Sequence, residues 1–140
     1  MGLDALVYLN KNNLEFDADR EGARTEERTG EVYFEDPPHE HESKAIHKRL
    51  GNATTVAAIV EEISGAVKKQ DLFLFSRVLY SAAHAGDVIE LKDLDQLQQD
   101  LTLIEDTTRE RRSKELAVFL ADMSELIHEA RKQKNPIVFV

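Results

Sequence analysis

The chain has 140 residues, of which 41% are hydrophobic and 32% charged, a composition typical of a globular protein rather than a disordered one. It contains no cysteine, which excludes a disulfide framework, a thiolate metal site and a cysteine nucleophile. Its 27 acidic residues outnumber its 18 basic residues, and the formal net charge of -9 argues against binding to nucleic acid or to anionic membranes. No apolar run reaches the ~20 residues that span a bilayer, and no secretory signal is visible. We therefore expect a cytoplasmic protein that forms a single domain over residues 1–140.

The N-terminal third of the chain predicts two short strands separated by a charged loop. Residues 3–9 form a run of aliphatic and aromatic side chains, which indicates a buried or half-buried strand. Residues 15–30 hold many charges and two glycines with little apolar pattern, and we interpret them as an exposed loop. Residues 31–35 predict a second strand, which ends at Pro37 and Pro38 because proline cannot donate to a ladder.

Apolar residues at helical spacing predict four or five helices in the middle of the chain. These helices cover residues 43–50, 52–69, 71–87, 91–104 and 113–134. Gly51 is a typical residue after the end of a helix, and Asn52 is a good N-cap for the next one. Residues 71–87 are the most apolar of the five segments, and Asp71 is placed to cap their start.

The last residues predict a third strand. Asn135 and Pro136 end the final helix, because the residue before a proline avoids helical backbone angles. Residues 137–140 are all apolar, and we expect them to pair beside residues 3–9 rather than to remain in water. The predicted fold is therefore α+β: a small sheet formed by the N-terminal, 31–35 and C-terminal strands, covered by four or five helices.

Two short motifs carry a resemblance to other proteins. The chain begins Met1-Gly2-Leu3-Asp4 and later contains Ala45-Ile46-His47-Lys48. In both motifs it resembles an uncharacterised group of small bacterial and phage proteins, which begin Met-Gly-Leu-Asp and carry an Ala-Ile-His-Lys helix. The resemblance implies a compact α/β or α+β protein of unknown activity. It transfers no catalytic residue and directs attention to His47.

A group of polar side chains at the end of the 71–87 segment is the first candidate site. On a helix, Arg77, Tyr80 and His84 fall in one stripe, with Ser81 beside it and Asp87 shortly after it. One interpretation is an enzymatic pocket, in which His84 transfers a proton, Asp87 orients its imidazole and Ser81 is a candidate nucleophile. In the same interpretation Arg77 and Tyr80 bind the ligand.

Two further considerations bear on this pocket. His47, from the Ala-Ile-His-Lys motif, is a third candidate for ligand binding. The alternative interpretation of the polar group is structural, with His84 capping the C-terminus of its helix, where a partly positive imidazole suits the helix dipole. No phosphate-binding loop or paired-carboxylate motif is present, and we expect no cofactor.

The segment around residues 39–42 is a candidate metal site. His39 and His41 alternate with Glu40 and Glu42, and imidazole and carboxylate are ligand types that zinc and nickel accept. Because the segment follows two prolines in a charged stretch, a solvated loop without metal is the alternative.

The acidic surface is the last candidate. Seven acidic residues are predicted on the outer faces of helices: Glu61, Glu62, Asp93, Asp95, Asp100, Glu105 and Asp106. Such faces normally only keep a protein dissolved. The functional hypothesis is a non-enzymatic interaction or regulatory protein, which binds a basic partner through its helical surface as an immunity protein or antagonist does. The other function hypothesis is the pocket around His47, Arg77, Tyr80, His84 and Asp87.

Overall fold

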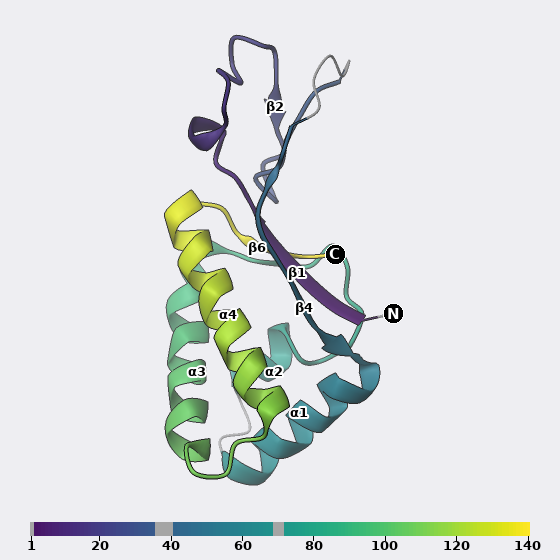
Figure 1. Cartoon of the computed structure of the whole chain (residues 1–140), viewed down its shortest axis with the longest axis vertical. Helices are drawn as coiled ribbons and strands as arrows, with labels where there is room; N and C mark the ends of the chain where they lie inside the picture. Colours follow the sequence, from purple (N-terminus) through teal and green to yellow (C-terminus); the bar gives the residue numbers. More distant parts are fainter. Residues whose placement is uncertain (1, 36–40, 69–71) are drawn as a thin grey trace.

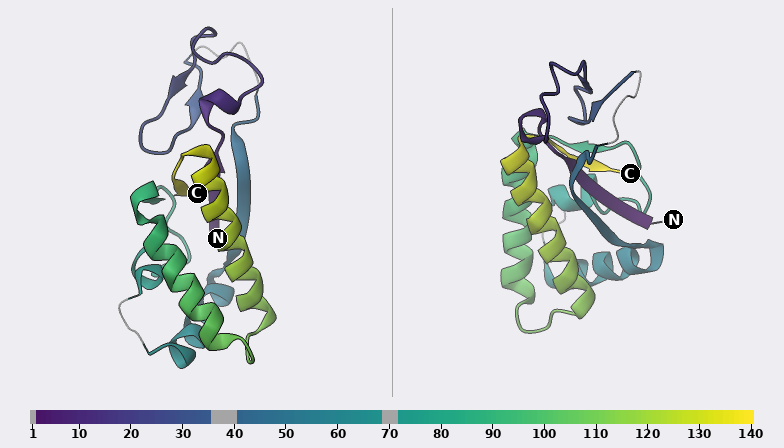
Figure 2. Two further views of the ribbon diagram at one scale, coloured as in Figure 1. Left: turned by 90° about the vertical axis from the view of Figure 1, so that its left-hand side faces the viewer. Right: turned by 45° about the horizontal axis from the view of Figure 1, so that its top comes forward.

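A computed structural model describes residues 2–35, 41–68 and 72–140 and divides into two parts (Figure 1). A body combines helices with a sheet, and a narrower extension, here called the arm, comprises residues 9–35 and 41–43 and projects from one end of it (Figures 1 and 2). The arm contains η1 (Lys11–Asn13), β2 (Arg24–Thr25) and β3 (Val32–Tyr33). The body contains β1 (Gly2–Tyr8), β4 (Lys44–Asn52), α1 (Ala53–Ala66), α2 (Phe73–Arg77), β5 (Val88–Ile89), η2 (Leu91–Asp93), α3 (Leu94–Thr108), α4 (Lys114–Gln133) and β6 (Ile137–Phe139).

The sheet of the body joins the two ends of the described chain. Its strand order is β4-β1-β6-β5, and every pairing is antiparallel. Ala5 lies opposite Phe139 and Leu6 opposite Val138, so the C-terminal strand pairs with the first strand. The prediction that residues 137–140 add beside residues 3–9 is confirmed, and so is the α+β class.

The two faces of this sheet bury different sets of side chains. Ala5, Val7 and Phe139 belong to the main core, to which α1, α3 and α4 contribute their apolar stripes. Leu6, Tyr8, Val88 and Val138 form a second, smaller cluster. The sets alternate along β1 because successive strand residues point to opposite faces. The helices therefore cover one face only, as Figure 2 shows.

Two of the three long helices, α1 and α4, begin where the sequence predicts, because each has its capping side chain; α3 begins three residues later than predicted, after η2, and its N-cap Asp93 makes no side-chain capping bond. The Asn52 side chain accepts a hydrogen bond from the Thr55 amide at 2.8 Å, which starts α1. Ser113 does the same for Leu116 at 3.1 Å and starts α4. Among the residues that the structure describes, no helix is both long and apolar enough to cross a membrane. The cytoplasmic location stays a prediction.

The prediction of a helix over residues 43–50 is wrong, because this segment is strand β4. It pairs antiparallel with the whole of β1, from Gly2 opposite Asn52 to Tyr8 opposite Lys44. Its buried Leu50 and partly buried Ile46 join the main core, whereas His47 faces outward, so the apolar spacing also fits a strand. Pairing with β1 outweighs the weak helical preference of a short segment.

The predicted 71–87 helix is also shorter than expected. Of the described residues 72–87, only Phe73–Arg77 are helical, and residues 78–87 form turns, bends and irregular structure. The carbonyl of Val78 accepts a hydrogen bond from the His84 ring at 2.8 Å, a bond that a continuing helix would have given to a backbone amide. Asp71, the expected cap, lies outside the described residues.

The 31–35 segment does not join the main sheet. Val32 and Tyr33 pair with Thr25 and Arg24 in a separate two-stranded hairpin on the arm. The positions that flank β1 in the main sheet are occupied by β4 and β6, which bury more apolar surface than the exposed Tyr33 and Glu35 would. The place of this strand in the predicted sheet is therefore corrected.

Candidate functional site

Three of the predicted site residues converge at the edge of the sheet. The Tyr80 hydroxyl donates to Asp87, and the Tyr80 and His84 rings stack with centroids 4.6 Å apart. On its other side the His84 ring contacts Phe139 at 4.3 Å. Only 4% of the His84 side chain is exposed, so the imidazole is enclosed between two aromatic rings. We call Tyr80, His84 and Asp87 the edge cluster.

The contacts of His84 define what its ring can do. Its Nε2 faces the Val78 carbonyl, and because a carbonyl only accepts, Nε2 carries a proton and donates. Its Nδ1 lies 3.2 Å from the Asp87 carboxylate but makes no hydrogen bond within the described structure, because the ring is poorly oriented for one. The pair is an ion pair only if the imidazole is protonated. His84 caps the end of α2, as the structural interpretation supposed, although that helix ends earlier than predicted.

The remaining residues of the predicted pocket do not join the edge cluster. Arg77 donates to the Val88 carbonyl at 3.1 Å and lies over the Phe73 ring. The Ser81 hydroxyl donates to the Ala83 carbonyl within a local turn and accepts from the Ala83 amide, and neither of these partners is a general base. His47 lies on β4 and contacts Asp4 at 3.3 Å, opposite Leu6 and therefore on the face away from the helices.

Replacing His84 with alanine should lower the free energy of unfolding by about 1–3 kcal/mol, because the Val78 carbonyl loses its buried donor. Ser81→Ala is the control, and its local turn should cost no more than about 0.5 kcal/mol. Urea denaturation followed by circular dichroism measures both. Equal stability of the two variants would show that the edge cluster does not hold the sheet edge together.

Of the two histidines proposed as metal ligands, the structure describes only one. His39 lies outside the described residues. His41 is described, and its Nε2 contacts the Val32 carbonyl at 3.1 Å, so this nitrogen donates to the protein and is not available to a metal. Within residues 2–35, 41–68 and 72–140, no group of three or more histidine, aspartate or glutamate side chains is placed to hold a metal ion.

Two of the acidic residues assigned to outer helix faces, Asp100 and Glu62, have partners inside the protein, which corrects the prediction for these two. Asp100 is 1% exposed and accepts hydrogen bonds from the Leu74 amide at 3.0 Å and from Gln96. Glu62 accepts from the Ser113 amide at 2.9 Å and from its hydroxyl, joining α1 to α4. Other members pair with arginines of the body, Asp95 with Arg131 and Asp106 with Arg109.

The described residues of the arm carry more than half of the net negative charge of the chain. They include nine acidic and four basic side chains, a net charge of -5 out of the chain's -9. Among the described residues, neither Glu15 nor Glu27 has an ion-pair partner, and both are exposed. Glu26 is held differently: the Thr29 hydroxyl and then the amides of Arg28 and Thr29 lower its pKa, so it stays ionised.

Amide side chains fix the base of the arm to the end of α4. The Asn10 backbone amide donates to Gln133 Oε1 at 2.9 Å, and the Asn13 side chain donates to the same oxygen at 2.8 Å. Asn135 donates to the Tyr8 carbonyl at 2.9 Å. Burial, followed by the charge and hydrogen bond of Glu31, raises the pKa of Tyr8 above its ordinary value. The base of the acidic arm is therefore held in place by hydrogen bonds to the end of α4.

A groove on the arm was not anticipated from the sequence. It has a volume of about 420 Å³ and lies between the segment after η1 and the start of β4. Its lining includes Leu14, Glu15, Phe16, His41 and Glu42. The residues after η1 and those before β4 are separated by 25 positions or more along the chain, and the pairing of β1 with β4 brings the two segments together.

Comparison with known proteins adds no information about this site. No protein-family model, no curated protein sequence and no solved structure matches the chain. The resemblance to small bacterial and phage proteins stays a prediction.

Proposed function

We propose that this protein is a non-enzymatic interaction protein that binds a basic protein partner through its acidic arm. The observation that carries the proposal is the position of the charge: nine acidic residues and four basic ones on a projecting arm (Figure 1). A negative surface that projects from the body attracts a basic partner over a long range and orients it. This is the kind of surface that an immunity protein or antagonist offers to its target.

The body is a less suitable binding surface because several of its charges are paired between its elements. Lys48 of β4 pairs with Glu125 of α4 at 2.6 Å, and Arg131 of α4 pairs with Asp95 of α3 at 2.8 Å. A partner that bound there would have to displace these contacts. The helical surface is therefore replaced by the arm as the proposed binding face.

The pocket hypothesis is less well supported by the geometry. His84 is enclosed by two rings and already donates to Val78, so it presents no proton to a substrate without breaking a structural contact. The two hypotheses are separable with one variant. If the arm binds the partner, His84→Ala should reduce stability but leave binding to a basic peptide unchanged.

The test uses a labelled peptide of alternating arginine and glycine as a defined basic probe, followed by fluorescence anisotropy. Affinity should fall steeply as ionic strength rises from about 0.01 M to about 0.15 M, over which the Debye length falls from about 30 Å to about 8 Å. An affinity that is flat over this range would contradict charge-driven binding.

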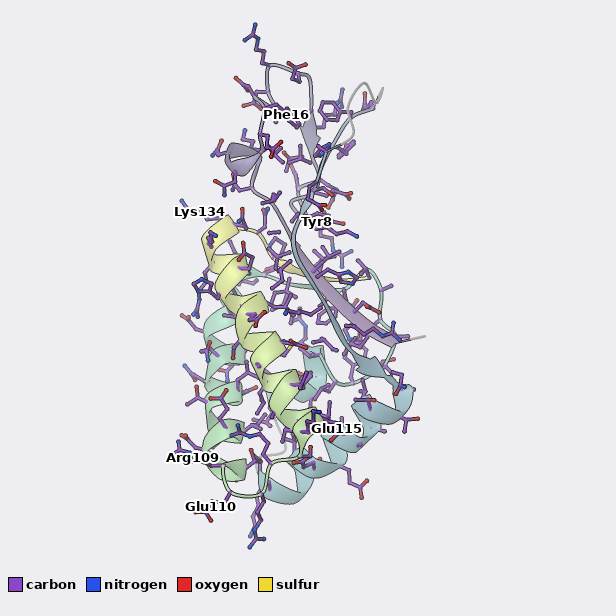
Figure 3. All side chains as sticks on the ribbon, viewed as in Figure 1. Tyr8, Phe16, Arg109, Glu110, Glu115 and Lys134 are labelled. Atoms are coloured by element: carbon purple, nitrogen blue, oxygen red, sulfur yellow. The ribbon has the colours of Figure 1, made fainter. Side chains whose placement is uncertain are left out.

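Matched variants locate the binding surface. Glu27→Gln with Glu35→Gln removes two charges from the arm, and Glu61→Gln with Glu110→Gln removes two from the body. Glu110 lies at the opposite end of the molecule from Phe16 of the arm (Figure 3). Because both double variants have the same net charge, only the arm variant should weaken binding of the peptide. Equal weakening would mean that overall charge, and not the arm, attracts the partner.

A further inference from the structure

The polar side chains that line the groove on the arm present hydrogen-bond acceptors. Gln133 Oε1 accepts from the Asn10 backbone amide, which can only donate, and this fixes the orientation of the Gln133 side chain. Asn13 must then donate its Nδ2 to the same oxygen, at 2.8 Å. Because the Asn13 Nδ2 is used in this bond, the side-chain oxygen of Asn13 is the acceptor that it can offer to a ligand.

The His41 side chain also offers an acceptor to the groove, because its donor is used within the protein. Its Nε2 donates to the Val32 carbonyl at 3.1 Å, so in the neutral imidazole Nδ1 is an acceptor. The exposed carboxylates of Glu15 and Glu42 add further acceptors, although Glu42 Oε1 already accepts from the Lys44 amide at 3.1 Å. No lysine or arginine belongs to the described lining of the groove.

An aromatic ring adjoins these acceptors. Phe16 lines the groove, packs on the Phe34 ring with centroids 5.8 Å apart and contacts the His41 ring edge-on at 5.5 Å. Leu9 and Leu14 supply aliphatic surface beside it. A planar cation gains from contact with an aromatic face, and its alkyl stem gains from contact with aliphatic side chains.

From these observations we propose that the groove binds an arginine side chain of the basic partner. Arginine carries five N–H donors and no acceptor, which is the complement of a lining whose polar side chains present acceptors, the side-chain donors of Asn13 and His41 being used within the protein. Its flat guanidinium contacts an aromatic ring at the wall of a groove, such as that of Phe16, better than the compact ammonium of lysine does. The inference rests on the proposed function and specifies which side chain of the partner is recognised.

The probe is Nα-acetyl-L-arginine amide, with the citrulline amide as a control of the same shape and no charge. Both are titrated at about pH 8, above the usual range of histidine titration, and followed by NMR. Arginine amide should shift the Asn13 side-chain amide and the Phe16 and His41 ring signals saturably, and citrulline amide should not. Equal saturable shifts with citrulline amide, or no shift of these signals with arginine amide, would overturn the inference.

Variants test the same groove on the folded protein, with circular dichroism to check folding. Glu15→Gln combined with Glu42→Gln should weaken arginine amide binding by about tenfold or more, because two charge-assisted contacts are lost. Phe16→Leu keeps the apolar bulk but removes the ring face, and should also weaken binding. The control pair Glu27→Gln with Glu35→Gln, on the same arm but outside the groove, should change it by less than about twofold.

The results separate the two proposals. If the control pair weakens arginine amide binding as much as the groove pair does, the groove is not a specific site. If the arginine–glycine peptide still distinguishes the arm variant from the body variant, the acidic arm remains the binding surface even then. If the groove binds arginine amide but the peptide does not distinguish arm from body, the proposed function fails while the site stands.

Discussion

Replacing Phe139 with alanine should lower the free energy of unfolding by about 3–5 kcal/mol, a large part of the 5–15 kcal/mol typical of a small domain. Phe139 is 1% exposed and lies in the main core. Its amide donates to the Asp87 carbonyl at 2.9 Å, its carbonyl accepts from Gly86 at 2.8 Å, and its ring packs on His84. The substitution therefore leaves a cavity where the C-terminal strand, the edge cluster and the core meet.

The control is the neighbouring Val140, which is 47% exposed. Val140→Ala should change stability by no more than about 0.5 kcal/mol, since an exposed side chain leaves no cavity. Urea denaturation gives both values. If Phe139→Ala is as stable as Val140→Ala, the C-terminal strand is not part of the core and the sheet topology is incorrect.

Replacing Asp100 with alanine should cost about 1–3 kcal/mol, although aspartate on a helix surface is normally replaceable. Asp100 is 1% exposed, and its Oδ2 accepts from the Leu74 amide in the first turn of α2. Without the carboxylate, this buried amide loses its partner, and an unsatisfied buried donor costs about that much. Asp100→Asn should cost less, because the amide oxygen still accepts from Leu74.

Asp95 provides the comparison on the same helix. Its side chain is 88% exposed and pairs with Arg131 in solvent, an arrangement worth no more than about 1 kcal/mol. Asp95→Ala should therefore leave the urea midpoint nearly unchanged, and Asp100→Ala should lower it clearly. Similar midpoints for the two variants would mean that Asp100 does not hold α2 against α3.

The long helices were predictable because their signals are local. An apolar stripe at helical spacing and a capping side chain both occur within a few residues, as at Asn52 and Ser113. The strand at residues 137–140 was predictable for a similar reason, since a proline precedes a short apolar run. Its partner followed from the need to bury that run beside the other apolar terminal segment.

Strand β4 could not be predicted from local pattern. Its apolar residues Ile46 and Leu50 are four apart, which fits one turn of a helix as well as alternate positions of a strand. Pairing with β1 decides between the two, and that pairing joins segments more than 35 residues apart. The prediction of a helix over residues 71–87 was wrong for a related reason. The His84 side chain takes the Val78 carbonyl as its partner, and the apolar pattern of the segment does not reveal this bond.

The candidate sites also differ in whether their residues are close together in the sequence. The convergence of Tyr80, His84 and Asp87 was predictable because these residues are close in sequence, and short loops keep them close in space. The burial of Asp100 and the groove beside Phe16 were not, because each depends on which segment packs opposite. Sequence shows the charge of a residue but not whether a partner within the protein already uses it.

The account depends most on the arm, rather than the helical body, being the surface that a basic partner meets. The most direct measurement is a backbone amide NMR titration with the arginine–glycine peptide at low ionic strength. We predict that the perturbed amides lie in residues 11–35 and 41–43, while those of α3 and α4 stay unchanged. Perturbations concentrated on α3 and α4, with the arm unaffected, would contradict the account.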